Sequence, residues 1–292
     1  MNRTGDDTAG PPAGPAVLFC PADRPDRFAK AFEVADAVIL DLEDAVRPDR
    51  KQVAREALRA GFGTLPAERA VVRVNAPHTA EGRADLELVR SVGVRFVMLP
   101  KAEYPADVEQ FDPASVIALC ETARGVENAP AIAAAGGCVA LMWGGEDLTA
   151  DIGGRSSRDA TGRYLPHVSY ARARILVAAA AARVVAWDGV YLDIPDRAGL
   201  EAECDDAVAM GFAAKVAIHP SHTPVIRRAY RPTDDELARA EELLGAVGAS
   251  TSGVVTVGGR MVDGPLVAMA RAVVAARRSA IPGADHETKE RI

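Results

Sequence analysis

AVILDLED (residues 37–44) is a short aliphatic run that ends in acidic residues, and similar runs recur along the chain. Near-continuous Val, Ile and Leu suit parallel strands that are covered on both faces. There are eight such runs: AVLFCP (16–21), AVILDLED (37–44), AVVRVN (70–75), FVMLPK (96–101), VIALCET (116–122), CVALMWG (138–144), WDGVYLD (187–193) and KVAIHP (215–220).

The stretches between these runs have helical spacing and helix signals. Examples are residues 23–35 and the long segment 166–182. In RPDRKQVAREALRAG (47–61), Pro48 suits a first helical turn and Gly61 suits a C-cap. Repeated strand–helix alternation predicts an α/β fold, a (β/α)8 TIM barrel. A doubly wound open sheet is the alternative, but the first run lacks the GxGxxG turn of a dinucleotide-binding fold.

The chain is predicted to have three parts. Residues 1–15, rich in Gly, Pro and polar residues, suit a disordered tail. Residues 16–230 form the barrel, and residues 231–292 form an extension that packs on the barrel or on a neighbouring subunit. In the extension, 231–247 begins with a capping-box pattern, 250–264 suits an irregular or hairpin segment, and 265–280 suits a helix.

Composition narrows the class of protein. Hydrophobic residues make up 49% of the 292 residues, which is enough for a large core, and the net charge of −7 argues against a nucleic-acid partner. The apolar stretches are too short to span a membrane, and no targeting segment is visible. The cysteines are not at CxxC spacing, so they suit buried core positions in a cytoplasmic protein: Cys20, Cys120, Cys138 and Cys204.

Glu121 and Asp147 are the sharpest pair of candidate functional residues. They follow consecutive strand runs, whose carboxyl ends carry the chemistry in this fold. Two adjacent carboxylates raise each other's pKa unless a cation lies between them. Oxygen ligands without nearby His or Cys suit Mg²⁺. The alternative is that each residue caps a helix in the loop after its strand.

Arg73 lies in the apolar run VVRVN, where a charge needs a partner or a ligand. A structural ion pair with Asp41 or Glu43 is the alternative to substrate binding. Asp41, Glu43 and Asp44 alternate in direction along the strand, so they cannot all point inward. We expect these acids to orient Arg73 and water on the metal.

The roles of two further residues at strand ends stay open. His219 is either a catalytic base or a loop histidine bonded to the barrel rim. Lys101 either contacts an anion or pairs with an acid, and the sequence does not rank the two.

In order and spacing, several motifs together resemble the citrate lyase β-subunit-like proteins of the HpcH/HpaI aldolase superfamily, close to the malyl-CoA and citramalyl-CoA lyases. The likeness covers residues 16–280. The motifs are LFCPADRPDRFAKA, VILDLEDAV, VRVN, MLPKAE, ALCETARGV, GGEDLTADIG, KVAIHPSH and GRMVDGPL. The chain departs from the family pattern at Ala22, Ala214, His222 and Trp187, the last of which suggests an effect on pocket width.

The resemblance implies a role for particular residues. Mg²⁺ would be bound by Glu121 and Asp147. Arg73 would contact substrate oxygens as a catalytic residue, and Glu121 would also take part in substrate binding. Asp263, contributed by an adjacent subunit, would act as the acid/base, which implies a homo-oligomer such as a trimer or hexamer. Coenzyme A would contact Phe19, Arg24 and Lys30.

The implied reaction is Mg²⁺-dependent carbon–carbon cleavage of a 3-hydroxyacyl-CoA into an acyl-CoA and a 2-oxo acid. The candidate substrates are malyl-CoA, citramalyl-CoA and a citryl thioester. Two alternatives stay open. One is a malate-synthase-like condensing enzyme or acyl-CoA thioesterase on the same scaffold, and the other is a partner-dependent citrate lyase β-type subunit.

Overall fold

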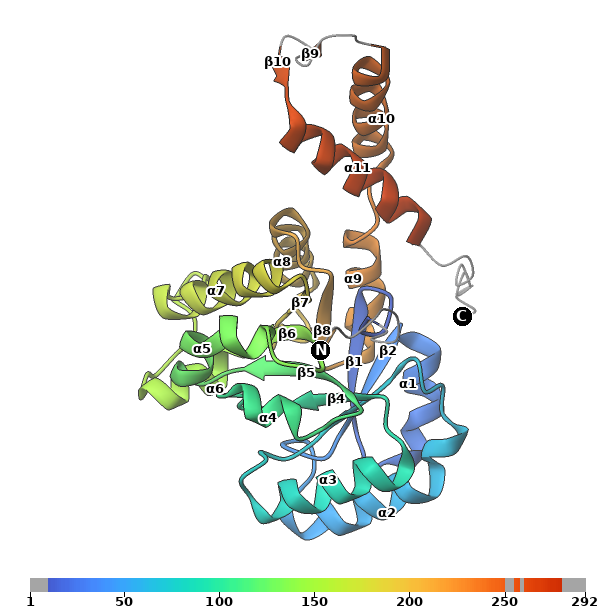
Figure 1. The fold of residues 1–292 in the computed structure, drawn as a ribbon, viewed down its shortest axis with the longest axis vertical. Coiled ribbons are helices and arrows are strands. Elements are labelled where there is room, and N and C mark those ends of the chain that lie inside the picture. Colours follow the sequence, from blue (N-terminus) through green and yellow to red (C-terminus); the bar gives the residue numbers. More distant parts are fainter. Residues whose placement is uncertain (1–9, 250–254, 258–259, 280–292) are drawn as a thin grey trace, which may run out of the picture. The chain divides into compact units, whose positions relative to one another are not determined.

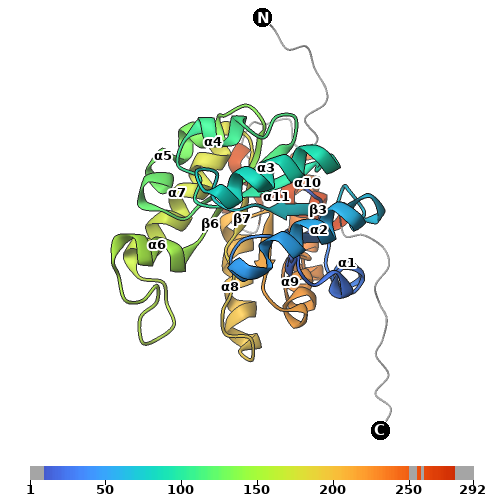
Figure 2. The same cartoon turned by 90° about the horizontal axis from the view of Figure 1, so that it is seen from below.

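The computed structural model describes residues 10–249, 255–257 and 260–279. Eight parallel strands close into a barrel in which each strand pairs with the next along the chain and the last pairs with the first. Figures 1 and 2 show helices around the outside of these strands. The prediction of a TIM barrel is therefore confirmed.

The strands are β1 (Ala16–Pro21), β2 (Ala37–Asp41), β3 (Ala70–Arg73), β4 (Phe96–Leu99), β5 (Ser115–Cys120), β6 (Cys138–Trp143), β7 (Val185–Asp188) and β8 (Ala214–Ala217). The helices that follow them are α1 (Phe28–Val34), α2 (Lys51–Gly61), α3 (Ala80–Val92), α4 (Pro105–Glu109), α5 (Ala123–Ala133), α6 (Gly145–Ile152), α7 (Pro166–Ala182), α8 (Arg197–Met210) and α9 (Thr223–Ala229). Short 3₁₀ turns cover Pro25–Arg27, Pro48–Arg50, Phe62–Thr64 and Pro220–His222.

The barrel interior is packed with apolar side chains from every strand. Because side chains in a strand alternate in direction, the residue two positions after an interior residue points the same way. Ile39, Val71 and Leu119 belong to this core. The next inward-facing positions on their strands are therefore Asp41, Arg73 and Glu121, at the carboxyl ends. Strand geometry alone thus directs three of the predicted site residues toward one end of the barrel.

Most element predictions match the structure, but several predicted runs extend past the strands, and three boundaries concern residues that were singled out. Strand β7 ends at Asp188, so Asp193 lies in the following loop. Strand β8 ends at Ala217, so His219 also lies beyond the strand. Gly61 is the last residue of α2 with φ −112°, and Phe62 is the C-cap. All four cysteines are buried and free, as predicted.

The chain divides into two compact units after Arg227. In the second unit, α10 (Asp234–Ala249) packs against α11 (Gly264–Ser279), and β9 (Val255–Val257) pairs antiparallel with β10 (Arg260–Val262). Thr233 and Glu236 form the predicted capping box through reciprocal side-chain to backbone hydrogen bonds. The predicted tail falls largely on residues 1–9, which lie outside the described residues. No described helix is both long and apolar enough to cross a membrane.

Candidate active site

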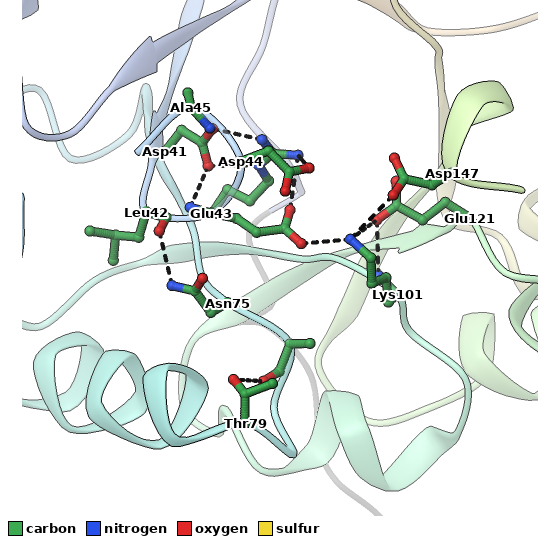
Figure 3. A network of polar contacts seen from close by, with 12 residues as sticks. Asp41, Leu42, Glu43, Asp44, Ala45, Asn75, Thr79, Lys101, Glu121 and Asp147 are labelled. Atoms are coloured by element: carbon green, nitrogen blue, oxygen red, sulfur yellow. Dashed lines mark hydrogen bonds and ion pairs between the residues drawn. The ribbon is translucent and has the colours of Figure 1, made fainter. Parts of the chain in front are cut away.

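Glu121 and Asp147 come from neighbouring strands of the barrel. Glu121 directly follows β5 and is 3% exposed, whereas Asp147 lies in the first turn of α6, just after β6, with a side chain that is 40% exposed. Strands β5 and β6 pair. Both carboxylates face one ammonium, that of Lys101, at 3.7 Å from Glu121 and 3.3 Å from Asp147. The structure therefore brings the predicted pair together around one cationic position (Figure 3).

Neither acid is a helix cap. Thr122 caps α5 by accepting a hydrogen bond from the backbone N–H of Gly125. The N-cap of α6 is Gly144, and no side chain makes a cap hydrogen bond there. The helix-capping alternative for Glu121 and Asp147 is therefore wrong.

A cation beside Glu121 would offset the cost of burying its negative charge. Burial and the nearby Asp147 together raise the pKa of Glu121 to about 8, against the opposing effect of Lys101. A Cβ atom on Gly144 would lie 2.7 Å from Oε2 of Glu121, so only glycine leaves room for the carboxylate here. Among the described residues no group of three or more His, Cys, Asp or Glu could hold a metal. Mg²⁺ commonly takes only one or two carboxylates with water and substrate oxygens, so this pair fits it.

Arg73 is buried and already partnered. Its Nε and Nη2 donate to the two carboxylate oxygens of Asp41 at 2.7 and 2.6 Å, and its Nη1 lies 3.1 Å from Glu43. The guanidinium also stacks over the ring of Phe19, 4.5 Å from its centroid. These contacts hold the pKa of Arg73 above its usual value against the opposing effect of burial. The ion pair that the sequence offered as an alternative is present, and Arg73 still lines the pocket.

The three acids at the carboxyl end of β2 divide as the alternation predicted. Asp41 and Glu43 are buried and face Arg73. Asp44 is 63% exposed and lies 3.9 Å from Arg73. Lys51 donates to the carbonyl oxygens of Leu42 and Glu43, both at 2.7 Å, and so fixes the chain that carries these acids.

Lys101 pairs with acidic residues, which is the second of the two roles that the sequence left open. Its ammonium donates to Oε1 of Glu43 at 2.7 Å, and Figure 3 shows it between Glu43 and the pair formed by Glu121 and Asp147. Its backbone N–H donates to Oε1 of Glu121 at 3.2 Å. Lys101 has φ +51°, a left-handed conformation that is uncommon for residues other than glycine. Such backbone conformations cluster at functional sites.

A pocket opens beside the two acids. Its apolar lining includes Phe19, Leu119, Met142 and Trp143, and its polar lining includes Arg73, Glu121, Glu146, Asp147, Arg158 and Tyr164. Pockets of this kind, mostly apolar with a few convergent polar groups, are typical of small-molecule sites. Trp187 is buried in the barrel core and does not line this pocket, although it belongs to the same core cluster as the lining residues Leu119 and Met142.

Arg158 and Tyr164 are pocket residues that the sequence reasoning missed. Both lie in the connection between α6 and α7, residues 153–165, whose length was the available signal. Arg158 stacks 3.7 Å from the ring centroid of Tyr164, and both side chains bond to Glu203. Glu203 also accepts a hydrogen bond from the fully buried Lys215, so a charge network supports this wall of the pocket.

The remaining predicted residues make local contacts with neighbours in the sequence. Arg24 pairs with Asp26 and Lys30 pairs with Glu33, all on the exposed surface. Asp263 is exposed in the second unit, directly before α11, and accepts a hydrogen bond from Leu266 N–H at 3.4 Å. His219 Nδ1 bonds with Ser221 in its own loop, which agrees with the loop-histidine alternative.

Comparison with known proteins gives consistent matches. The model of the family described as HpcH/HpaI aldolase/citrate lyase matches residues 16–220. A citrate lyase subunit beta-like protein of Mycobacterium tuberculosis is 50% identical over 262 residues, covering 90% of this chain and 95% of the relative. The mitochondrial citramalyl-CoA lyase of Mus musculus is 31% identical, covering 89% and 84%. A (3S)-malyl-CoA thioesterase of Cereibacter sphaeroides is 32% identical, covering 89% and 93%.

Solved structures give the same result. The protein CitE from Mycobacterium tuberculosis, solved in complex with magnesium, acetoacetate and coenzyme A, has a TM-score of 0.87 to this chain at 49% sequence identity. The match covers 91% of this chain and 98% of CitE.

Proposed function

The chain belongs to the HpcH/HpaI aldolase/citrate lyase family, and on that premise we propose that it is a Mg²⁺-dependent carbon–carbon lyase acting on a 3-hydroxyacyl-CoA. The products are an acyl-CoA and a 2-oxo acid. The observation that carries the proposal is the convergence of Glu121 and Asp147 on one cationic position beside the pocket that Arg73 lines. Relatives named as a citramalyl-CoA lyase, and a similar structure that contains magnesium and coenzyme A, support the substrate class and the cofactor.

In this proposal Glu121 and Asp147 hold Mg²⁺. The ion supplies Lewis-acid stabilisation of the substrate oxygens that become the 2-oxo acid. Arg73 donates charge-assisted hydrogen bonds to oxygens that gain negative charge as the bond breaks. Asp41 and Glu43 already contact the guanidinium nitrogens of Arg73. We propose that these contacts orient Arg73 toward the pocket.

The bond changes balance without a further reactant. The substrate hydroxyl loses its proton to water, its oxygen forms the C=O of the 2-oxo acid, and the electrons of the cleaved carbon–carbon bond pass to the acyl-CoA carbon. Asp263 protonates that carbon and regains its proton from water, or removes the carbon's proton in the condensation direction. We propose that Asp263 comes from an adjacent copy of the chain, which makes the active species a homo-oligomer, a trimer or hexamer.

Coenzyme A is proposed to contact Phe19, Arg24 and Lys30. Phe19 lines the pocket, so it can meet the thioester end of the ligand. Arg24 and Lys30 are exposed cations whose surface partners, Asp26 and Glu33, can yield to phosphate. The scattered, non-CxxC spacing of four buried thiols supports a cytoplasmic location.

A second function has specific support. One relative is named a (3S)-malyl-CoA thioesterase, so a thioesterase or condensing activity on the same scaffold is the alternative. Product analysis separates the alternatives when the purified chain is incubated with Mg²⁺ and malyl-CoA, citramalyl-CoA or citryl-CoA. The lyase releases a 2-oxo acid and an acyl-CoA. The thioesterase releases free coenzyme A, and a partner-dependent subunit leaves all three substrates intact.

A further inference from the structure

We infer that Lys101 is the internal counter-ion of the metal site and that its ammonium competes with Mg²⁺ for Glu121 and Asp147. The inference rests on the proposed Mg²⁺ site and adds a residue that sets how tightly this site binds its ion. Lys101 acts through the two acids, so it is a positioning residue.

The first observation is that one ammonium lies within ion-pair distance of three carboxylates. Nζ of Lys101 lies 2.7 Å from Glu43, 3.3 Å from Asp147 and 3.7 Å from Glu121. Only the contact with Glu43 is a hydrogen bond of ordinary length. Glu43 therefore anchors the ammonium, while the longer contacts neutralise the other two acids and leave their oxygens available (Figure 3).

The second observation is that the backbone holds Lys101 in this place. Its left-handed conformation, at φ +51°, directs the backbone N–H to Oε1 of Glu121, the same oxygen that the ammonium approaches. Oε1 of Glu121 therefore lies near both the backbone N–H and the side-chain ammonium of Lys101. On the other side, Lys51 donates a hydrogen bond to the carbonyl oxygen of Glu43, so the buried anchor is itself held in place.

The third observation is the charge balance. Glu43 and Glu121 are buried carboxylates, so a nearby positive charge stabilises their ionised forms. Without the ammonium, the metal-free protein would hold these carboxylates close together with Arg73 as the remaining cation beside Glu43. A divalent ion that enters the site meets the positive charge of Lys101 at short range, and this repulsion weakens its binding.

These contacts predict a direction of change in Mg²⁺ affinity that is opposite to the change expected for a purely structural residue. Removal of the Lys101 charge should destabilise the metal-free protein and tighten Mg²⁺ binding. A residue that only shapes the site would, when removed, loosen the site and weaken Mg²⁺ binding.

The test is calorimetric titration of Mg²⁺ into the full chain. Lys101→Met should bind Mg²⁺ tighter by about tenfold or more, a change of about 1.4 kcal/mol. Lys101→Arg, which keeps the charge, should bind like the wild type. Arg59→Met removes one positive charge from an exposed position on α2, away from the barrel interior, and should leave the dissociation constant unchanged. In EDTA the Lys101→Met Tm should fall below that of the wild type, and saturating Mg²⁺ should close the gap.

An equal or weaker Mg²⁺ affinity in Lys101→Met would overturn the inference. Lys101→Gln, which can still donate a hydrogen bond to Glu43, replaces it in the same titration if Lys101→Met does not fold. Asp147→Asn separates the inference from the proposed function. If the wild type binds Mg²⁺ and Asp147→Asn does not, an unchanged Lys101→Met refutes only the counter-ion role. If Asp147→Asn binds Mg²⁺ like the wild type, the proposed metal site itself is wrong.

Discussion

Arg73 and Asp41 are register partners on paired strands β3 and β2, and they form a two-point ion pair with N–O distances of 2.7 and 2.6 Å. Asp41 is fully buried and Arg73 nearly so. The pair therefore fixes the direction of the one guanidinium that the proposed mechanism aims at the substrate.

Asp41→Asn should lower stability and activity together. It leaves a buried guanidinium with Glu43 as its remaining acidic partner, so we expect a loss of roughly 2–3 kcal/mol in the free energy of unfolding. Urea denaturation measures this loss, and kcat/KM on the thioester substrate should fall as Arg73 loses its alignment. The control is Asp44→Asn at an exposed position, which should change stability by less than about 0.5 kcal/mol. Equal effects in the two variants would contradict the alignment role.

Arg24→Ala and Lys30→Ala should weaken coenzyme A recognition without unfolding the protein. Both side chains are exposed and their ion pairs are local, so the midpoint of urea unfolding should not move. Loss of a phosphate contact should raise KM for the CoA thioester roughly tenfold in each variant while kcat changes little. Arg47→Ala, at another exposed cation, is the matched control. An unchanged KM in the double variant would remove these residues from the coenzyme A site.

Asp263→Asn should abolish turnover while preserving the fold. Asn is as good an N-cap as Asp, so α11 keeps its cap and the melting temperature should stay that of the wild type. Loss of the acid/base should reduce kcat by roughly 10²–10⁴-fold. Co-expression with Asp147→Asn tests the source of Asp263. Hybrid oligomers should regain activity if Asp263 serves a neighbouring copy, and should stay inactive if it serves its own chain.

The four thiols should be unreactive in the folded protein. Burial raises the pKa of Cys20 to about 11 and those of Cys138 and Cys204 to about 12, and it also raises the pKa of Cys120. A raised pKa means that the thiolate forms only at higher pH, so at pH 8 about a thousandth or less of each thiol is ionised. Iodoacetamide at pH 8 should label the native chain negligibly and all four cysteines in denaturant. Rapid labelling of the native chain would show that the core is open.

The barrel could be predicted from the sequence because eight aliphatic runs, each ending in polar residues, alternate with stretches of helical spacing. Glu121 and Asp147 could be paired for the same reason, since consecutive strands of a barrel are neighbours. The end of β7 was misplaced because the apolar pattern continues after Asp188. The structure instead places Gly189 against the ring of Trp143, where a Cβ atom would lie 3.1 Å away, and the chain leaves the sheet.

Contacts between residues far apart in the chain could not be predicted in this way. The bond from Lys101 to Glu43 joins residues that follow two non-adjacent strands, β4 and β2, and the left-handed backbone that aims Lys101 has no signal in the run FVMLPK. Glu203 holds Arg158 across 45 positions of sequence, so neither residue suggested the other. The role of Arg73 could not be decided from the sequence, because an ion pair and a substrate contact both call for an arginine at this position. The structure contains the ion pair, and Arg73 also lines the pocket.

The most direct test is the Mg²⁺-dependent cleavage of malyl-CoA and citramalyl-CoA by Glu121→Gln and Asp147→Asn. Each variant removes one of the two carboxylates that are proposed to hold the ion, so we expect rates below roughly a thousandth of the wild type at any Mg²⁺ concentration tested. Asp151→Asn, in the same helix α6 but at an exposed position, should cleave at the wild-type rate. A wild-type rate in either Glu121→Gln or Asp147→Asn, with Mg²⁺ still required, would contradict the assignment of the metal site.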